Sequence, residues 1–354
     1  MKTILFSLLA LSFAFSSSAQ VVEEYGGGKV SENPVMDKID LKEIGRSIHV
    51  ASVEEGKVVV RRFYRGKWEE FDQTPIKDIF KLKRLELFAY RATPYVFCQY
   101  DDKMTVIRAI DDKWEIVGEE TFGEGSVDNT TFSVIGEKPF IVYEDKDYDI
   151  IRMFSLYDES WYDFDLMSNE GVKSFKIAAN DRGDVFLAVL TDEGMMFKMI
   201  DQEVDQMEQW EELSKDYKVG NVDRIDDFSF VGNKAYLTYH NEFGPVIITL
   251  EDMAKKWEII EEATDEKVIT LGKQHYNLNI SEYYFFTSLS DKGMPQFLKN
   301  NKKGVWGDVT DLSTKKARAI ASDDYRNIIY VAYVDDATQH LMVKKIEKGE
   351  LESE

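Results

Sequence analysis

Short apolar runs recur along the chain at nearly even intervals. Seven of them are apolar at successive positions, which is typical of a strand buried on both faces. They begin at Ile48, Tyr95, Phe140, Val185, Ala235, Tyr283 and Ile328. A more alternating run follows many of them, such as Met104 to Ile107, and a weaker run precedes them, such as Leu85 to Ala89. The pattern predicts repeated units of antiparallel strands.

The tryptophans mark the same repeat. All six start a short run after a polar turn, at positions 68, 114, 161, 210, 257 and 306, so the gaps are 46, 47, 49, 47 and 49 residues. A repeat of this length built from short strands is typical of β-propeller blades. Since one position carries Trp in so many units, we interpret these residues as packing wedges between blades, with the indole N–H donated to a local carbonyl. The alternative is a row of platforms for sugar rings.

Seven apolar runs but only six Trp-led strands leave one blade a strand short. An open ring would expose a sheet edge, which proteins usually cover. We therefore predict an all-β, seven-bladed propeller of four-stranded antiparallel blades, closed by a strand from the N-terminal segment. The alternative is six blades and a partial one.

The leading residues have the features of a secretory signal peptide. Lys2 precedes an apolar run from Ile4 to Phe15, and Ser17-Ser18-Ala19 offers small residues for cleavage. We expect a signal peptide over 1–19, an extended segment over 20–38 and the propeller over 39–354. The protein is then exported to the periplasm or the cell exterior. No later run has the length and apolarity of a membrane-spanning helix.

The net charge and the cysteine content limit the functions that the chain can have. The net charge of −22 argues against nucleic acid as a partner. The single cysteine, Cys98, lies inside an apolar run and is interpreted as a small buried hydrophobe. One small basic group, Lys77, Lys81, Lys83 and Arg84, is interpreted as the solvated face of a loop between blades.

One unit carries the repeat most completely. It contains, in order, Pro94-Tyr95-Val96, Tyr100-Asp101, Val106, Trp114 and Val117-Gly118. Pro139 to Asp145 and Tyr330 to Asp335 follow the same pattern. The pattern resembles bacterial secreted propeller repeat proteins whose blades contain Pro-Tyr-Val-Ala-Tyr, Asp and Trp-x-x-Val-Gly. The resemblance spans residues 39–354, and it implies a propeller and export but no defined reaction.

The turns after the seven apolar runs are acidic. If the blade register is right, these turns share one face and form an acidic rim around the channel. The predicted rim residues are Asp101, Asp102, Glu144, Asp145, Asp192, His240, Glu242, Asp291, Asp335 and Asp336. One interpretation is turn chemistry, since tight turns favour Asp and Asn. The other is a site for a cation, a cationic peptide or Ca²⁺. No stretch has the spacing of a calcium loop, so we predict no cofactor.

Histidines give little support for catalysis. No two of His49, His240, His275 and His340 have metal-ligand spacing, and His49 is interpreted as a core residue. His240 ends an apolar run at the acidic face and is the first to test. We expect a non-enzymatic, monomeric binding propeller for a protein or glycan, without membrane insertion. The alternatives are a glycan-active enzyme with carboxylates at the channel mouth, such as a glycoside hydrolase, and a purely structural surface repeat.

Overall fold

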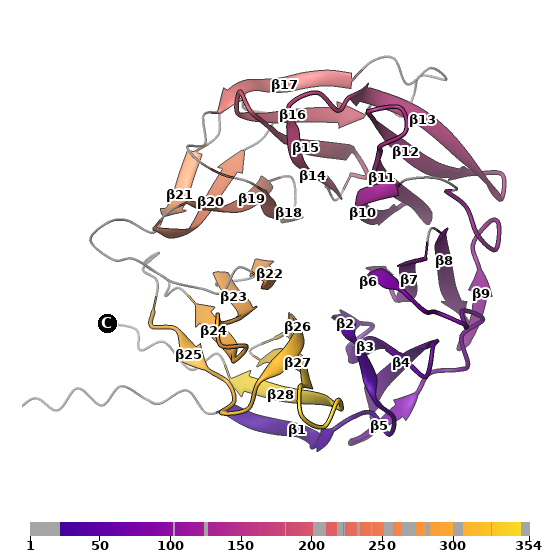
Figure 1. The fold of residues 1–354 in the computed structure, drawn as a ribbon, viewed down its shortest axis with the longest axis vertical. Coiled ribbons are helices and arrows are strands. Elements are labelled where there is room, and N and C mark those ends of the chain that lie inside the picture. The colour runs from indigo at the N-terminus through magenta and orange to yellow at the C-terminus, as the bar shows by residue number, and fades with distance from the viewer. Residues whose placement is uncertain are drawn as a thin grey trace, which may run out of the picture.

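The computed structural model describes residues 22–347, apart from 102, 124–126, 181, 201–209, 218–221, 223, 232–233, 242, 251–257, 263–273, 281–283, 300–306 and 327. These residues form 28 strands, which make seven four-stranded antiparallel sheets arranged as a ring (Figure 1). The prediction of a seven-bladed propeller is confirmed, and the six-bladed alternative is wrong. A search of the described residues for a helix long and apolar enough to cross a membrane finds none. The expected signal peptide lies outside the described part.

The first three blades follow one another along the chain. Blade 1 contains β2 (Val35–Ile44), β3 (Ser47–Glu54), β4 (Lys57–Tyr64) and β5 (Lys67–Glu70). Blade 2 contains β6 (Leu82–Tyr90), β7 (Thr93–Tyr100), β8 (Lys103–Ile110) and β9 (Lys113–Ile116). Blade 3 contains β10 (Val127–Ile135), β11 (Lys138–Asp145), β12 (Ile150–Tyr157) and β13 (Ser160–Ser168).

The next three blades have the same strand order. Blade 4 contains β14 (Val172–Ala179), β15 (Val185–Thr191), β16 (Met195–Ile200) and β17 (Trp210–Tyr217). Blade 5 contains β18 (Ile225–Val231), β19 (Lys234–Asn241), β20 (Gly244–Leu250) and β21 (Glu258–Glu262). Blade 6 contains β22 (Gln274–Ile280), β23 (Tyr284–Leu289), β24 (Pro295–Lys299) and β25 (Thr310–Asp311).

Blade 7 is completed by the N-terminal segment, as predicted. Its strands are β26 (Ala317–Tyr325), β27 (Ile328–Asp335), β28 (Leu341–Glu347) and, outermost, β1 (Val22–Lys29). β1 pairs antiparallel with β28, with Val22 opposite Ile346. β2 then begins at Val35, so blade 1 starts earlier than the expected residue 39. The two ends of the described chain therefore meet in one sheet (Figure 1).

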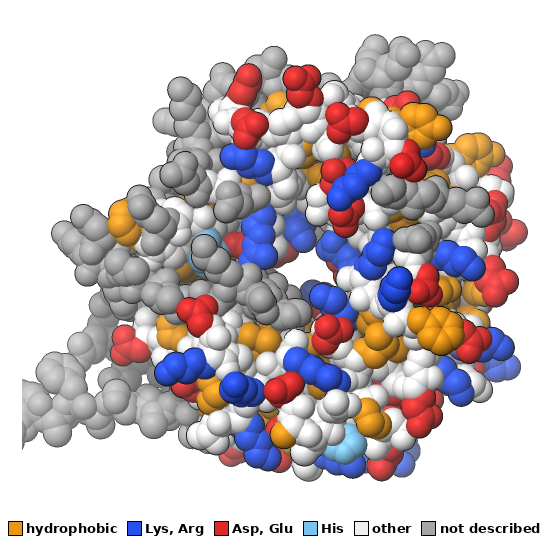
Figure 2. Space-filling model, in the orientation of Figure 1, with side chains coloured by type: hydrophobic (Ala, Val, Ile, Leu, Met, Phe, Trp, Pro, Cys, Tyr) orange, Lys and Arg blue, Asp and Glu red, His pale blue; other side chains and the backbone are white. Residues whose placement is uncertain are grey.

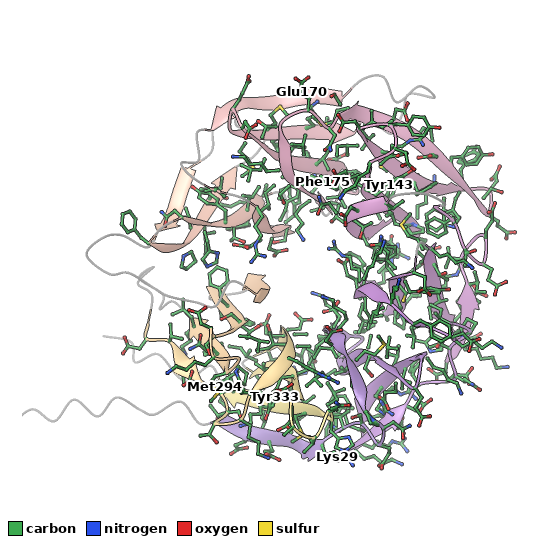
Figure 3. The ribbon with its side chains drawn as sticks, viewed as in Figure 1. Lys29, Tyr143, Glu170, Phe175, Met294 and Tyr333 are labelled. Carbon is green, nitrogen blue, oxygen red and sulfur yellow. The ribbon has the colours of Figure 1, made fainter. Side chains whose placement is uncertain are left out.

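The core lies between neighbouring blades. Second strands are buried along nearly their whole length because a blade packs on each side, as β3 and β7 show. Phe175 of blade 4 shares one buried cluster with Ile135 and Val142 of blade 3, and Figure 3 shows Phe175 and Tyr143 in adjacent blades. Cys98 is free and fully buried, and burial raises its thiol pKa. Its interpretation as a small buried hydrophobe is confirmed.

The described tryptophans pack between blades as predicted, but the predicted hydrogen bond of the indole N–H is wrong for Trp114, which is buried against blade 1 without a hydrogen-bond partner among the described residues. Trp161 of blade 3 donates its indole N–H to the carbonyl of Val117 in blade 2, at 3.2 Å, and stacks on Phe122 with ring centroids 4.2 Å apart. Trp68 of blade 1 donates to the carbonyl of Tyr25 on β1, at 3.4 Å. Each of these tryptophans therefore ties its blade to the preceding one. The side chains of Trp210, Trp257 and Trp306 lie outside the described part.

Near the beginning of every inner strand, the pairing with the second strand of the same blade is irregular. The register shifts in all seven blades, between 35 and 39, 82 and 84, 128 and 131, 172 and 174, 225 and 227, 274 and 277, and 317 and 319. Such bulges leave a residue without a direct partner and redirect its side chain. In four blades a single residue is extra and it is charged, namely Lys83, Lys173, Asp226 and Arg318. Charged side chains therefore occupy the bulges near the beginnings of these four inner strands.

Candidate functional site

The inner strands enclose a cavity of about 640 Å³ at the centre of the ring. Its lining comes from β2, β6, β10, β14, β18 and β26, and polar side chains predominate on it. The charged residues among them are Lys38, Asp40, Lys42, Lys83, Arg84, Glu86, Lys176, Asp226 and Asp227. Figure 2 shows Lys and Arg side chains gathered around the central opening, whereas most Asp and Glu side chains in view lie farther out. The cavity has the size of a small-molecule site.

Side chains of the inner strands hold neighbouring blades together around this cavity. The Asp40 carboxylate of blade 1 accepts from the backbone N–H of Leu87 in blade 2, at 2.7 Å. The Asp323 carboxylate of blade 7 accepts from the N–H of Glu43 in blade 1, also at 2.7 Å. Both carboxylates link neighbouring blades, and Asp40, which lines the cavity, is a fixed acceptor on its wall before any ligand arrives.

Burial perturbs the charged groups of the wall. It raises the pKa of Asp40 to about 6, although Lys42 and two backbone N–H groups act in the opposite direction. Burial would lower the pKa of Lys42, but Asp323, Asp40 and Asp227 raise it overall. Burial, and then the charge of Arg84, lower the pKa of Lys176. Perturbed groups in a concave site are typical of functional positions.

The raised pKa of Asp40 predicts a pH-dependent stability. Between its unfolded value of 3.8 and its folded value of about 6, the folded state binds more protons, so stability falls as pH rises through this window. The effect is at most about 3 kcal/mol and smaller where channel water screens the charge. We expect Asp40→Asn to flatten the dependence of the unfolding midpoint on pH between 4 and 6. Equal slopes for wild type and variant would contradict the assignment.

A second pocket, of about 330 Å³, lies at the end of the channel where the inner strands begin, and we call it the mouth pocket. It is bounded by β10, β14 and β18, with Arg84 reaching in from β6. Its charged lining residues are Arg84, Lys173, Lys176, Arg224 and Asp226. Four cations and one carboxylate give this pocket a positive charge in a strongly acidic protein.

Three predicted rim residues contact the lining of the mouth pocket. Glu144 accepts from the side-chain amide of Asn129, at 2.5 Å, and Asp192 pairs with Lys173 at 3.2 Å. Nδ1 of His240 lies 2.5 Å from a carboxylate oxygen of Asp226. In each case the end of a second strand touches the bulged part of the first strand in the same blade. The rim thus positions residues that line the pocket.

Other rim residues shape their own turns. Asp145 accepts from the backbone N–H of Asp147, at 3.1 Å, and Asp335 accepts from that of Thr338, at 2.8 Å. Asp101 has the positive φ of 50° that a tight turn requires, and Asp192, Asp291 and Asp336 are exposed. Asp102 and Glu242 lie outside the described part. The described lining of the central cavity includes none of the rim residues, because the inner strand separates these turns from the channel.

The residues that line the cavity were mostly not predicted. The basic group was interpreted as a solvated loop, but this is wrong for Lys83 and Arg84, which lie on β6 and line the cavity. Lys42, Lys176 and Asp226 sit on weak inner strands whose polar positions were the available signal. His49 is confirmed as a core residue: it is buried, its Nδ1 lies 3.1 Å from the carbonyl of Ser47, and burial lowers its pKa to about 4.

Metal ligation finds no support in the described side chains. A search of them for three or more His, Cys, Asp or Glu residues that could hold an ion finds no group. The carboxylates of the mouth are instead engaged with cationic or amide side chains, as Asp226 is with Arg224. The described site can therefore offer hydrogen bonds and ion pairs.

Comparison with solved structures shows the fold. A variant of the Aleuria aurantia lectin in complex with Fucα1-6GlcNAc has 13% identity and a TM-score of 0.50, and the match covers 81% of this chain and 98% of the lectin. The SapL1 lectin in complex with α-methyl fucoside has 10% identity and a TM-score of 0.51, covering 80% and 97%. A putative 6-phosphogluconolactonase from Bacteroides uniformis has 13% identity and a TM-score of 0.51, covering 78% and 85%.

Comparison of the sequence with known families and proteins does not assign the chain to a family. No protein-family model matches the chain, and no curated protein does so at a significant level.

Proposed function

We propose that the protein is an exported, non-enzymatic, monomeric binding propeller that holds a glycan in its central cavity. The observation that carries the proposal is the cavity of about 640 Å³, walled by the inner strands and lined by side chains of both charges. Sugars present many hydroxyl groups, each of which donates and accepts hydrogen bonds. A wall that alternates Lys and Asp supplies partners for both roles.

Preorganisation of the wall supports a binding role. Asp40 lines the cavity and is held by the backbone N–H of Leu87 in the next blade, so its remaining lone pairs have fixed positions. Fixed polar groups lose little conformational entropy when a ligand binds. The fucosides in the two lectin structures of similar fold make glycans the first ligand class to test.

Export is part of the proposal and rests on the leading residues. Lys2, the apolar run after it and Ser17-Ser18-Ala19 are typical of a cleaved signal peptide. The proposed mature chain begins at Gln20. N-terminal sequencing of the protein recovered outside the cytoplasm tests this part, and a retained Met1 in that fraction would contradict it.

Blocking the cavity tests the binding role. Ser229 lies on β18 and lines the cavity, so Ser229→Trp should fill part of it. Ser160 is exposed at the start of β13, which makes Ser160→Trp the matched control. We expect glycans identified on an array to bind the wild type and the control alike. Calorimetric titration should show at least about tenfold weaker binding to Ser229→Trp, since the insertion removes polar contacts. Equal affinity for both variants, or no glycan bound by the wild type, would overturn the proposal.

A glycan-cleaving enzyme is the second candidate, and one observation favours it. Asp226 is engaged by Arg224 and His240, whereas burial raises the pKa of the adjacent Asp227. Two neighbouring carboxyls in contrasting environments are typical of acid and base partners in glycosidases. Chromatography of array-positive glycans after long incubation separates the two functions: product formation that Asp227→Asn abolishes would establish the enzyme.

A further inference from the structure

The mouth pocket has a charge opposite to that of the whole chain. It is lined by Arg84, Lys173, Lys176 and Arg224, while the chain carries a net charge of −22. At physiological salt, electrostatic forces in solvent are largely screened beyond about 8 Å, so distant carboxylates of the protein repel an approaching anion only weakly. Local charges therefore decide what enters this pocket.

The one carboxylate of the mouth pocket is already engaged. Asp226 accepts from Nε of Arg224, at 3.0 Å, and lies 2.5 Å from Nδ1 of His240. Its side chain is only 2% exposed. A ligand therefore meets the cations of the pocket rather than this carboxylate.

The cations of the pocket differ in how far their charge is already compensated. Lys173 pairs with Asp192 of the rim, at 3.2 Å, and Arg84 pairs with Glu86 on the same strand. Among the described residues no carboxylate lies within ion-pair distance of Lys176, although Glu86, Asp227 and Asp226 act on its charge from farther away. It is half-buried and lines both the mouth pocket and the central cavity. A partly desolvated ammonium group that no carboxylate contacts directly is expected to attract an anion.

A neutral donor completes the pocket. The Ser174 hydroxyl, two residues from Lys176, accepts from the backbone N–H of Ile225 at 3.2 Å. Its own hydrogen is left to donate, because a hydroxyl is both donor and acceptor. An ammonium group and a hydroxyl on one strand fit the two oxygens of a carboxylate or two oxygens of a sulfate.

We propose that the mouth pocket between β10, β14 and β18 binds an acidic group of the glycan, a carboxylate or a sulfate, with Lys176 as its anchor. This inference rests on the proposed function and names the substrate class: acidic rather than neutral sugars. The uncharged part of the glycan then extends into the central cavity, which shares Arg84, Lys176 and Asp226 with the mouth pocket.

The test compares glycans that differ only in charge. Oligogalacturonides and their methyl esters form one such pair, sulfated and unsulfated oligosaccharides form a second, and inorganic sulfate is the anion without sugar. Each is titrated calorimetrically against wild type, Lys176→Gln and Lys113→Gln. Lys113 is exposed on the outer strand β9, so its substitution changes the net charge equally, away from the pocket.

We expect the wild type and Lys113→Gln to prefer an acidic form over its neutral counterpart by about tenfold or more, and Lys176→Gln to lose this preference. Equal binding of the charged and neutral forms, or a preference that survives in Lys176→Gln, would overturn the inference while the glycan function stands. Sulfate binding that depends on Lys176, without any glycan binding, would leave the anion pocket and overturn the glycan function. Binding of none of the probes would overturn the inference, and the glycan function would fall with it only if the array also shows no glycan bound.

Discussion

Deletion of residues 22–29 is expected to abolish the stable ring, because these residues are the outer strand of blade 7. β1 is paired with β28 from Val22 opposite Ile346 onward, and Glu23 forms an ion pair with Lys345 at 2.7 Å. Without β1, the edge of β28 loses its partner and becomes a template for association with other chains. We expect most of the molecules to aggregate, and any soluble fraction to unfold at a markedly lower temperature.

Tyr25 accounts for much of this effect. Its ring lies 4.1 Å from that of Phe63 in blade 1 and 4.9 Å from that of Tyr330 in blade 7, measured between centroids. It therefore joins the first and last blades of the ring. Loss of a fully buried aromatic side chain costs about 3–5 kcal/mol, and Tyr25 is half-buried, so we expect a smaller loss from Tyr25→Ala. Whole proteins are stable by only about 5–15 kcal/mol.

Thermal unfolding and size-exclusion chromatography measure the effect of the deletion. The matched control is a variant that begins at Val22, which keeps every residue of β1. The control should behave as the full mature chain does, and Tyr25→Ala should fall between the control and the deletion. A deletion variant that stays monomeric with an unchanged unfolding temperature would show that the ring closes without β1.

Gly118→Ala is expected to destabilise the protein by about 2–4 kcal/mol, from backbone and packing terms together. Gly118 follows β9 and has a positive φ of 71°, which L-residues adopt at a cost. A Cβ there would lie 2.7 Å from Nε1 of Trp161 and 2.8 Å from Cδ1 of Leu156. The substitution would therefore push Trp161 of blade 3 away from blade 2.

Gly66→Ala separates the two causes. Gly66 also has a positive φ, of 84°, but no atom lies within 4 Å of a Cβ built there. We expect this control to lose only the backbone part, about 1–2 kcal/mol. Urea unfolding of both variants gives the comparison, and equal losses would mean that the contact between Trp161 and Gly118 contributes nothing to stability.

Repetition explains how much of the fold could be predicted. The second strands are apolar on both faces because blades pack on each side, so Tyr95 to Cys98 and its six counterparts stand out without any structure. The count of seven such runs against six tryptophans led to the closing strand, which the pairing of β1 with β28 confirms. The start of blade 1 was placed too late, because the irregular pairing between Val35 and Ile39 interrupts the alternation of β2.

The same irregularity hid the site. Inner strands face a channel rather than a neighbouring blade, so their sequences need no regular apolar pattern, and a bulge reverses which positions face inward. Lys83 and Arg84 therefore resembled a loop although they belong to β6. The acidic turns could be predicted because their residues are contiguous in sequence. The contacts of these turns to Asn129, Lys173 and Asp226 could not be predicted, because those residues lie on another strand.

The sequence by itself determined the number of blades, the strand that closes them, the packing of the described tryptophans between blades and the burial of Cys98. Each of these follows from a local pattern that repeats, and the physical cause is burial of apolar side chains between neighbouring blades of similar architecture. Only the tertiary structure decided that Lys42, Lys176 and Asp227 share one cavity and that a basic pocket opens within an acidic protein. These residues come from different blades, and only closure of the ring brings their charges together.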